Sequence, residues 1–292
     1  MADQLTPNGH IDEVSGVETT GHEWDGIREL NNPMPRWWVL CFYATIIWAI
    51  GYCVLYPAWP LINDATRGVL GFSSRAEFAA DMNAAKVAQS AVVEKITASS
   101  LQEIAADPQL SQFATAAGAA AFRVNCTPCH GSGAAGGQGY PNLNDNDWLW
   151  GGNLDQIYQT VAHGIRDPAD PETRISEMPA FADMLKPNEV REIAAYVVSL
   201  TGTPRDPAMA TPGKQLFADN CASCHGEKAE GNRDMGAPDL ADAIWLKVDG
   251  EAGIARQILA PRHGVMPAWN ARLGDVAVKQ LAVYIHSLGG GE

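Results

Sequence analysis

Apolar residues follow a helical period over much of the chain and form one continuous apolar run near its start. Residues 37–63 hold no charged side chain, and the segment 37–56 is long enough to cross a bilayer as one helix. Aromatic residues typical of membrane–water interfaces flank the run, and prolines behind it would end a helix; these are Trp37, Trp38, Tyr56, Trp59, Pro57 and Pro60. The pattern predicts a transmembrane anchor helix over residues 37–60.

The region before this run, residues 1–36, is polar and acidic and shows neither a helical nor a strand period. We expect it to be a largely disordered tail. A cleavable signal peptide is the competing interpretation of the apolar run. Such a peptide has basic residues before its apolar part and small residues at its cleavage site, near the start of the chain. The sequence lacks this arrangement, so it favours an uncleaved anchor.

Residues 61–110 follow the anchor and contain apolar residues at helical spacing between positions 73 and 98. The stripe consists of Phe78, Met82, Ala85, Val92 and Ile96, with Gln89 interrupting it. It predicts a helical linker between the anchor and the remainder of the chain.

From about residue 111 the chain repeats one series of motifs. Each copy reads Gly-x-x-x-Phe, Cys-x-x-Cys-His, Pro-x-Leu-x-Asp-x-x-Trp, His-Gly and Met-Pro-Ala, followed by a helix with an apolar stripe. The series predicts two helical domains, residues 111–203 and 204–292. The first copy alone carries residues 166–177 between its His-Gly and Met-Pro pairs, and we expect a surface loop there.

The Cys-x-x-Cys-His motif is typical of c-type haem attachment. Two cysteines on one helical turn can reach both vinyl groups of the porphyrin, and the histidine then lies under the iron. We expect two covalently bound haem c, the first on Cys126 and Cys129, the second on Cys221 and Cys224, with His130 and His225 as axial ligands. A thioredoxin-like pair or a zinc site would not explain a histidine after both pairs.

The sixth iron ligand is expected to be a methionine, because a thioether suits an electron carrier of high potential. Met178 and Met266 occupy corresponding places in the two copies. Packing within one repeat favours Met178 on the first haem and Met266 on the second, whereas an exchange between the halves would use the same two residues and stays open. The rival ligands are Met184, Met235, His163 and His263.

The proline of each Pro-x-Leu motif, Pro141 or Pro238, is expected to offer its carbonyl to the free ring N–H of the axial histidine. The glycine-rich residues 131–139 lack the Lys-Ser/Thr pair of a phosphate loop. We find no carboxylate pair or activated nucleophile for chemistry on an organic substrate. The pattern therefore predicts electron relays, with both axial positions of each iron filled.

The formal net charge of −14 argues against nucleic acid as a partner. An acidic surface beside a haem suits a basic partner such as a soluble cytochrome c, although general solubility would explain the charge equally well. Haem c is attached on the outer side of the bacterial inner membrane. We therefore expect the haem domains in the periplasm and the N-terminal tail in the cytoplasm.

One anchor, a helical linker and two tandem haem c domains resemble the diheme cytochrome c subunit, subunit III, of cbb3-type cytochrome c oxidase. Residues 25–38, which read DGIRELNNPMPRWW, look like the segment that precedes the membrane in that family. The resemblance implies a mainly α fold, with one N-terminal transmembrane helix followed by two class I-like cytochrome c domains. The same six attachment and histidine residues and the two methionines would hold the haems.

By this resemblance the chain is a non-catalytic electron-transfer subunit of the oxidase. It would take electrons from a soluble or membrane cytochrome c and pass them to a monohaem cytochrome c subunit. From there they would reach the catalytic haem-copper subunit, which reduces oxygen to water with proton translocation. Two alternatives keep the anchor and haems: a free-standing membrane-anchored diheme carrier, and the cytochrome subunit of a periplasmic dehydrogenase.

Overall fold

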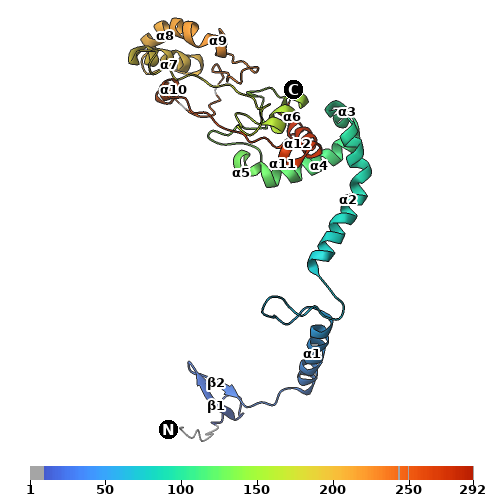
Figure 1. The fold of residues 1–292 in the computed structure, drawn as a ribbon. Coiled ribbons are helices and arrows are strands. Elements are labelled where there is room, and N and C mark those ends of the chain that lie inside the picture. The colour runs from blue at the N-terminus through green and yellow to red at the C-terminus, as the bar shows by residue number, and fades with distance from the viewer. Residues whose placement is uncertain (1–9, 243, 249, 292) are drawn as a thin grey trace. The chain divides into compact units, whose positions relative to one another are not determined.

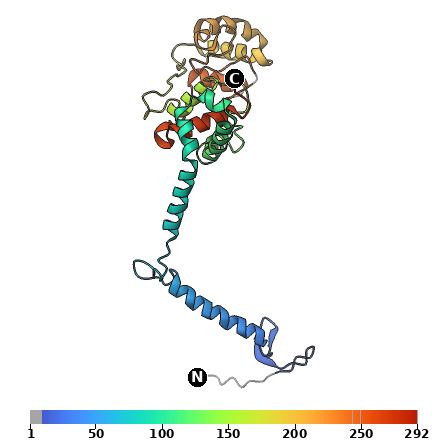
Figure 2. The ribbon, with the colours of Figure 1, turned by 90° about the vertical axis from the view of Figure 1, so that its right-hand side faces the viewer.

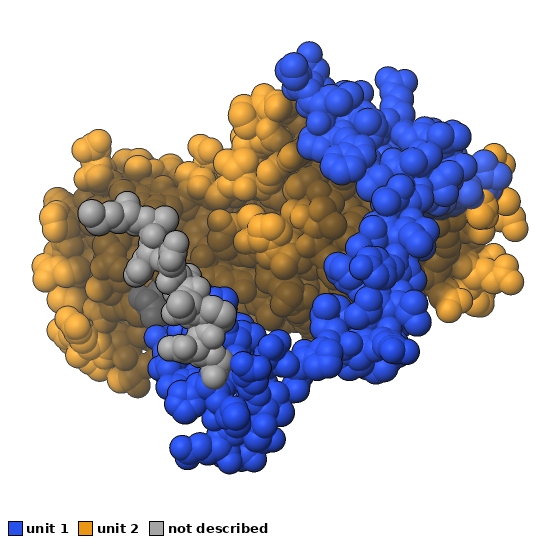
Figure 3. Space-filling view, turned by 90° about the horizontal axis from the view of Figure 1, so that it is seen from below, with its two compact units in different colours: residues 1–87 blue, residues 88–292 orange. Residues whose placement is uncertain are grey.

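The computed structural model describes residues 10–242, 244–248 and 250–291. The chain divides into two compact units, residues 1–87 and residues 88–292 (Figure 3). The described residues are mainly helical, with a single two-stranded sheet near the N-terminus (Figure 1). This confirms the predicted fold class.

A β-hairpin occupies part of the acidic tail, so the prediction of a disordered tail is wrong for these residues. Strand β1 (Thr19–Trp24) pairs antiparallel with β2 (Ile27–Leu30). The turn residues Asp25 and Gly26 have φ of 49° and 84°, as a type I′ turn requires, and Asp-Gly is a preferred sequence for it. The part of the tail at residues 1–9 lies outside the described residues.

Helix α1 (Arg36–Leu55) is the apolar segment, with 20 residues and a mean hydropathy of 2.0. By length and composition it can cross a membrane. It ends earlier than the predicted span of residues 37–60. Tyr56 is already extended, with ψ of 162°, because Pro57 disfavours helical backbone in the residue before it.

The predicted linker helix is α2 (Ser74–Ala98), and two more helices follow it, α3 (Leu101–Ala106) and α4 (Pro108–Asn125). Ser100 and Glu103 form a reciprocal capping box at the start of α3. Ile96, Leu101 and Ile104 are buried in the core of the unit 88–292. Residues 88–98 of α2 and the whole of α3 therefore belong to the unit that carries the repeats.

The last helices of the two repeats are exchanged. Helix α12 (Asp275–His286), at the end of the second repeat, packs on α4 and on α6 (Leu154–His163) of the first. Helix α7 (Pro187–Thr201), at the end of the first repeat, packs on α8 (Pro207–Asn220) and α10 (Gly250–Leu259) of the second. Figures 1 and 2 show the unit as two helical groups, α7 lying with α8 in one of them.

Each hydrophobic core is consequently built from both repeats. One core combines Phe122 and Ile157 with Val278 and Leu281, and the other combines Val190 and Ile193 with Phe217 and other residues of the second repeat. We expected each repeat to pack its own last helix. The sequence repeats and the packed cores do not coincide.

A glycine at the centre of each exchanged contact lets the two helices approach closely. A methyl group at Gly118 would collide with the carbonyl oxygen of Gln280 on α12, and one at Gly213 with that of Glu192 on α7. The phenylalanine one turn later meets a tyrosine of the exchanged helix. The ring centroids lie 5.4 Å apart for Phe122 and Tyr284 and 5.3 Å apart for Phe217 and Tyr196.

We expect Gly118→Ala to destabilise the fold by about 1–3 kcal/mol, the usual cost of overpacking a close contact. The measurement is the midpoint of thermal unfolding of the full chain in detergent, followed by circular dichroism. Gly133→Ala is the matched control, because a methyl group there meets nothing within 4 Å. Equal midpoints for the two variants would contradict the close crossing of α4 and α12.

Candidate haem centres

Both Cys-x-x-Cys-His motifs lie at the end of a helix and form one further helical turn, α5 (Thr127–His130) or α9 (Ala222–His225). The backbone N–H of His130 donates to the carbonyl of Cys126 at 2.9 Å, and that of His225 to Cys221 at 3.0 Å. The turn thus presents both cysteines and the histidine together. Burial is the main cause that raises the pKa of Cys126, and likewise that of Cys221, to about 11.

The predicted contact between the histidine of each Cys-x-x-Cys-His motif and its proline is confirmed. Nδ1 of His130 lies 3.1 Å from the carbonyl oxygen of Pro141, and Nδ1 of His225 lies 3.1 Å from that of Pro238. Because a carbonyl only accepts, Nδ1 carries the proton and Nε2 keeps its lone pair for a metal. Burial lowers the pKa of both histidines, which favours the neutral form that binds iron.

An apolar cleft opens beside the first motif. It is lined by Phe122, Cys126, His130, Leu143, Trp148, Ile157, Val161, Met266 and Ile285, among others. The cleft thus contains an attachment cysteine, a directed imidazole, a thioether and mostly apolar walls. These residues fit a covalently bound haem.

Met266 and Ile285 reach this cleft from the second repeat. The backbone N–H of Trp269 donates to the carbonyl of Val161 at the end of α6, at 3.1 Å. Ile165 and Met266 exchange both backbone hydrogen bonds, at 2.9 and 3.0 Å. The segment that carries Met266 is therefore attached to the first repeat.

The second centre is built in the reciprocal way. Met178 and Cys221 both pack against the apolar cluster that contains Phe181 and Phe217. The backbone N–H of Phe181 donates to the carbonyl of Ile258 at the end of α10, at 3.1 Å. This is the counterpart of the Trp269 contact, so the methionine segment of each repeat lies against the other repeat.

The rival ligands are placed less favourably. The side chains of Met184 and Met235 are 63% and 38% exposed, and His263 is exposed. His163 lies with Nδ1 3.2 Å from a carboxylate oxygen of Asp170 and Nε2 3.4 Å from one of Glu172. Both of its ring nitrogens thus face carboxylates of the insertion.

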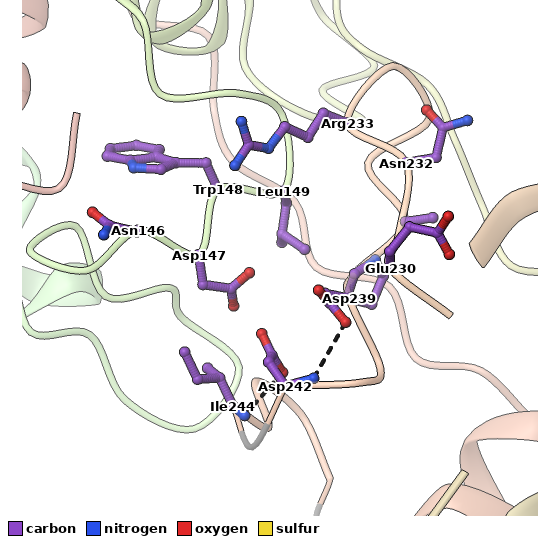
Figure 4. Close-up of a pocket in the computed structure, with 12 residues that line it drawn as sticks. Asn146, Asp147, Trp148, Leu149, Glu230, Asn232, Arg233, Asp239, Asp242 and Ile244 are labelled. Carbon is purple, nitrogen blue, oxygen red and sulfur yellow. Dashed lines mark hydrogen bonds between the residues drawn. The ribbon is translucent and has the colours of Figure 1, made fainter. Parts of the chain in front are cut away.

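An acidic hollow of about 250 Å³ adjoins both centres (Figure 4). Asp147, Trp148 and Leu149 line it and also line the first cleft, while Pro238, which accepts from His225, lines it from the second repeat. Figure 4 shows the carboxylates of Asp147 and Asp242 pointing toward one another.

The hollow raises the pKa of Asp147 to about 6, first through burial and then through the carboxylates of Asp242, Asp145 and Asp239, with Arg233 acting in the opposite direction. Asp147 has no signal of its own in the sequence. Asp145 and Asp242 occupy the same position in the two repeats, whereas the position equivalent to Asp147 is Ile244 in the second repeat. Only the folded chain reveals how many carboxylates converge there.

Comparison with known families identifies the architecture. The family described as the N-terminal domain of cytochrome oxidase-cbb3, FixP, matches residues 16–63, and the family described as cytochrome c oxidase, cbb3-type, subunit III, matches residues 113–197 and 208–285. The chain belongs to the FixP/CcoP family of cbb3-type cytochrome c oxidase subunits.

Relatives support this along the whole chain. The chain is 66% identical to the cbb3-type cytochrome c oxidase subunit FixP of Rhizobium meliloti over the full length of both. It is 54% identical to subunit CcoP of Cereibacter sphaeroides over 94% of this chain and 95% of that one. It is 50% identical to FixP of Bradyrhizobium diazoefficiens over 99% of this chain and all of that one.

The family resemblance inferred from the sequence is therefore confirmed. The chain is a cytochrome c electron-transfer subunit of the oxidase, with two tandem cytochrome c domains and two haem c. Helix α1 is its candidate membrane anchor. Membership of this family replaces the two alternatives, a free-standing diheme carrier and a dehydrogenase subunit.

We expect Asp147 to make one haem potential depend on pH. An ionised carboxylate beside the first cleft stabilises the ferric state, so the midpoint potential should fall as pH rises through about 6, by at most about 59 mV per pH unit. Asp147→Asn should remove this slope and raise the potential at pH 7.5. The measurement is a redox titration of the full chain between pH 5 and 8.

Asp183→Asn is the control for this titration, because Asp183 is exposed and outside the hollow. It should keep the wild-type slope. If Asp147→Asn keeps that slope too, the carboxylate does not titrate with the haem.

Proposed function

We propose that the chain is a non-catalytic relay within the oxidase. Electrons enter from a cytochrome c donor, cross its two haems and leave through a monohaem cytochrome c subunit to the catalytic haem-copper subunit. The observation that carries this is that His130, whose Nδ1 is held by the Pro141 carbonyl, and Met266 line the same cleft. In the second centre, Met178 and Cys221 pack against one apolar cluster, and Nδ1 of His225 is held by the Pro238 carbonyl. Two protein ligands on an iron leave no open position for oxygen and favour electron transfer.

We propose the following ligation, in which the methionines are exchanged. Cys126 and Cys129 hold the first haem, with His130 and Met266 on its iron. Cys221 and Cys224 hold the second, with His225 and Met178 on its iron. The cleft that contains both His130 and Met266 supports this, as do the exchanged helices and the reciprocal contacts of Trp269 and Phe181.

The haem supplies a one-electron couple, and the chain's residues set its surroundings. The carbonyls of Pro141 and Pro238 hold the imidazoles in one orientation, which preserves the ligand geometry in both oxidation states. Apolar walls such as Phe122 and Ile285 keep water away from the first haem. A dry, apolar surrounding disfavours the more positively charged ferric state and so raises the potential.

We also propose the orientation in the membrane. Haem c is attached outside the inner membrane, so residues beyond α1 are periplasmic and the β1–β2 hairpin is cytoplasmic. The family match over residues 16–63 covers the hairpin together with α1, which supports a role for this segment in binding the other oxidase subunits. The net charge of −14 suits a basic cytochrome c as the donor.

The ligation is tested in a background that retains only the first haem, made by Cys221→Ser with Cys224→Ser. There, Met266→His should lower the remaining midpoint potential by about 100 mV or more, since axial ligands shift haem potentials over about 0.8 V. Met178→His should leave it unchanged. The opposite pair of results would mean that each methionine serves the haem of its own repeat.

The proposed partners are tested by purifying the tagged chain from native membranes in mild detergent. We expect a pyridine haemochrome spectrum with b-type haem and with more c-type haem than two per chain. Washing in high salt serves as the control for loose association. Only c-type haem, at two per chain, would contradict permanent assembly with a catalytic and a monohaem subunit.

A further inference from the structure

The insertion at residues 166–177 occurs only in the first repeat. It leads directly into Met178, and it also contacts the segment that carries Met266. The sequence pattern of this insertion predicts only a surface loop. In the structure, Ile165 at its start pairs with Met266 on one side and with Arg174 of the insertion on the other. Gly164 lies so close to residues 266–268 that a methyl group there would collide with the carbonyl oxygen of Met266.

Arg166 joins the two methionine segments. Its Nε donates to the carbonyl oxygen of Gly264 at 2.7 Å, and its Nη1 donates to the carbonyl oxygen of Ser176 at 2.7 Å. Gly264 lies two residues before Met266, and Ser176 lies two residues before Met178. One guanidinium therefore contacts the backbone two residues before each methionine.

The backbone at Arg166 is suited to this placement. Its φ is 54°, in the left-handed region that few non-glycine residues adopt. Its N–H donates to the carbonyl of Arg174 at 2.9 Å. A strained residue that persists is held by its surroundings, and such residues gather at functional sites.

Asp167 holds the Met266 segment at a second point. Its Oδ2 accepts the backbone N–H of Ala268, two residues after Met266, at 2.7 Å. Its Oδ1 accepts the N–H of Ala169 at 2.9 Å, and its own N–H donates to the hydroxyl of Thr173 at 3.0 Å. Hydrogen bonds to ionised groups are about twice as strong as neutral ones. Arg166 therefore holds the backbone two residues before Met266, and Asp167 holds the backbone two residues after it.

We propose that Arg166 and Asp167 are positioning residues for the iron–methionine bonds, Arg166 for both haems and Asp167 for the haem that Met266 serves. This rests on the proposed ligation by Met178 and Met266. Arg166 links the two methionine segments through one guanidinium, and this link lies in the insertion that only the first repeat contains.

The test measures how easily an external ligand displaces the methionine. Imidazole is titrated into the full-length, haem-loaded ferric chain in detergent, and the near-infrared charge-transfer band of methionine-ligated ferric haem is recorded. Arg166→Ala should raise the imidazole affinity of both haems about tenfold, as the loss of a charge-assisted hydrogen bond would give. Asp167→Ala should raise it for one haem only.

Conservative variants separate positioning from a general loss of structure. Asp167→Asn should restore most of the wild-type affinity, because its amide oxygen can still accept the N–H of Ala268. Glu172→Ala, in the same insertion but in contact with His163, is the matched control and should behave as wild type. Unchanged imidazole affinity in Arg166→Ala and Asp167→Ala, whatever their thermal stability, would overturn the proposal.

Methionine variants distinguish this failure from a failure of the ligation itself. Met266→Ala and Met178→Ala should each remove half of the near-infrared band. If they do, and Arg166→Ala leaves the affinity unchanged, only the positioning role is wrong. If Met266→Ala leaves the whole band in place, the proposed ligation is wrong and the positioning role fails with it.

Discussion

The close crossing of a glycine-bearing helix with the last helix of the other repeat is the contact on which the haem-bearing unit depends. Gly118 lies against α12 and Gly213 against α7, and in each case a buried phenylalanine one turn later covers the core beside the haem motif. Because the helices are exchanged, neither repeat can complete its core alone. The two cytochrome c domains of the sequence therefore form one compact unit, residues 88–292.

The exchange has a direct consequence for the haems. The segments that carry Met178 and Met266 lead into α7 and α12, so each is drawn against the opposite repeat and fastened there through Phe181 or Trp269. In the proposed ligation, residues of both repeats therefore hold each haem. Arg166 adds a polar link between the same two segments.

Much of the fold and of the haem sites could be predicted from the sequence, and the features that could not be predicted have identifiable physical reasons. The haem motifs and the Pro141 and Pro238 carbonyl contacts are local in sequence and were readable. The exchange was not, because both repeats have the same glycine and the same apolar stripe, so α12 matches α4 and α8 equally well. Arg166 lies in a charged stretch that resembles any solvated loop. The Asp25-Gly26 pair is a typical hairpin turn sequence, but the acidic composition around it favours disorder, so the hairpin was not predicted.

The most direct test of this account is a crystal structure of the haem-loaded chain, with the irons located by anomalous scattering. The account predicts the sulfur of Met266 on the iron bound by His130 and the sulfur of Met178 on the iron bound by His225. Methionine and histidine from the same repeat on each iron would contradict the exchanged arrangement and the positioning role of Arg166.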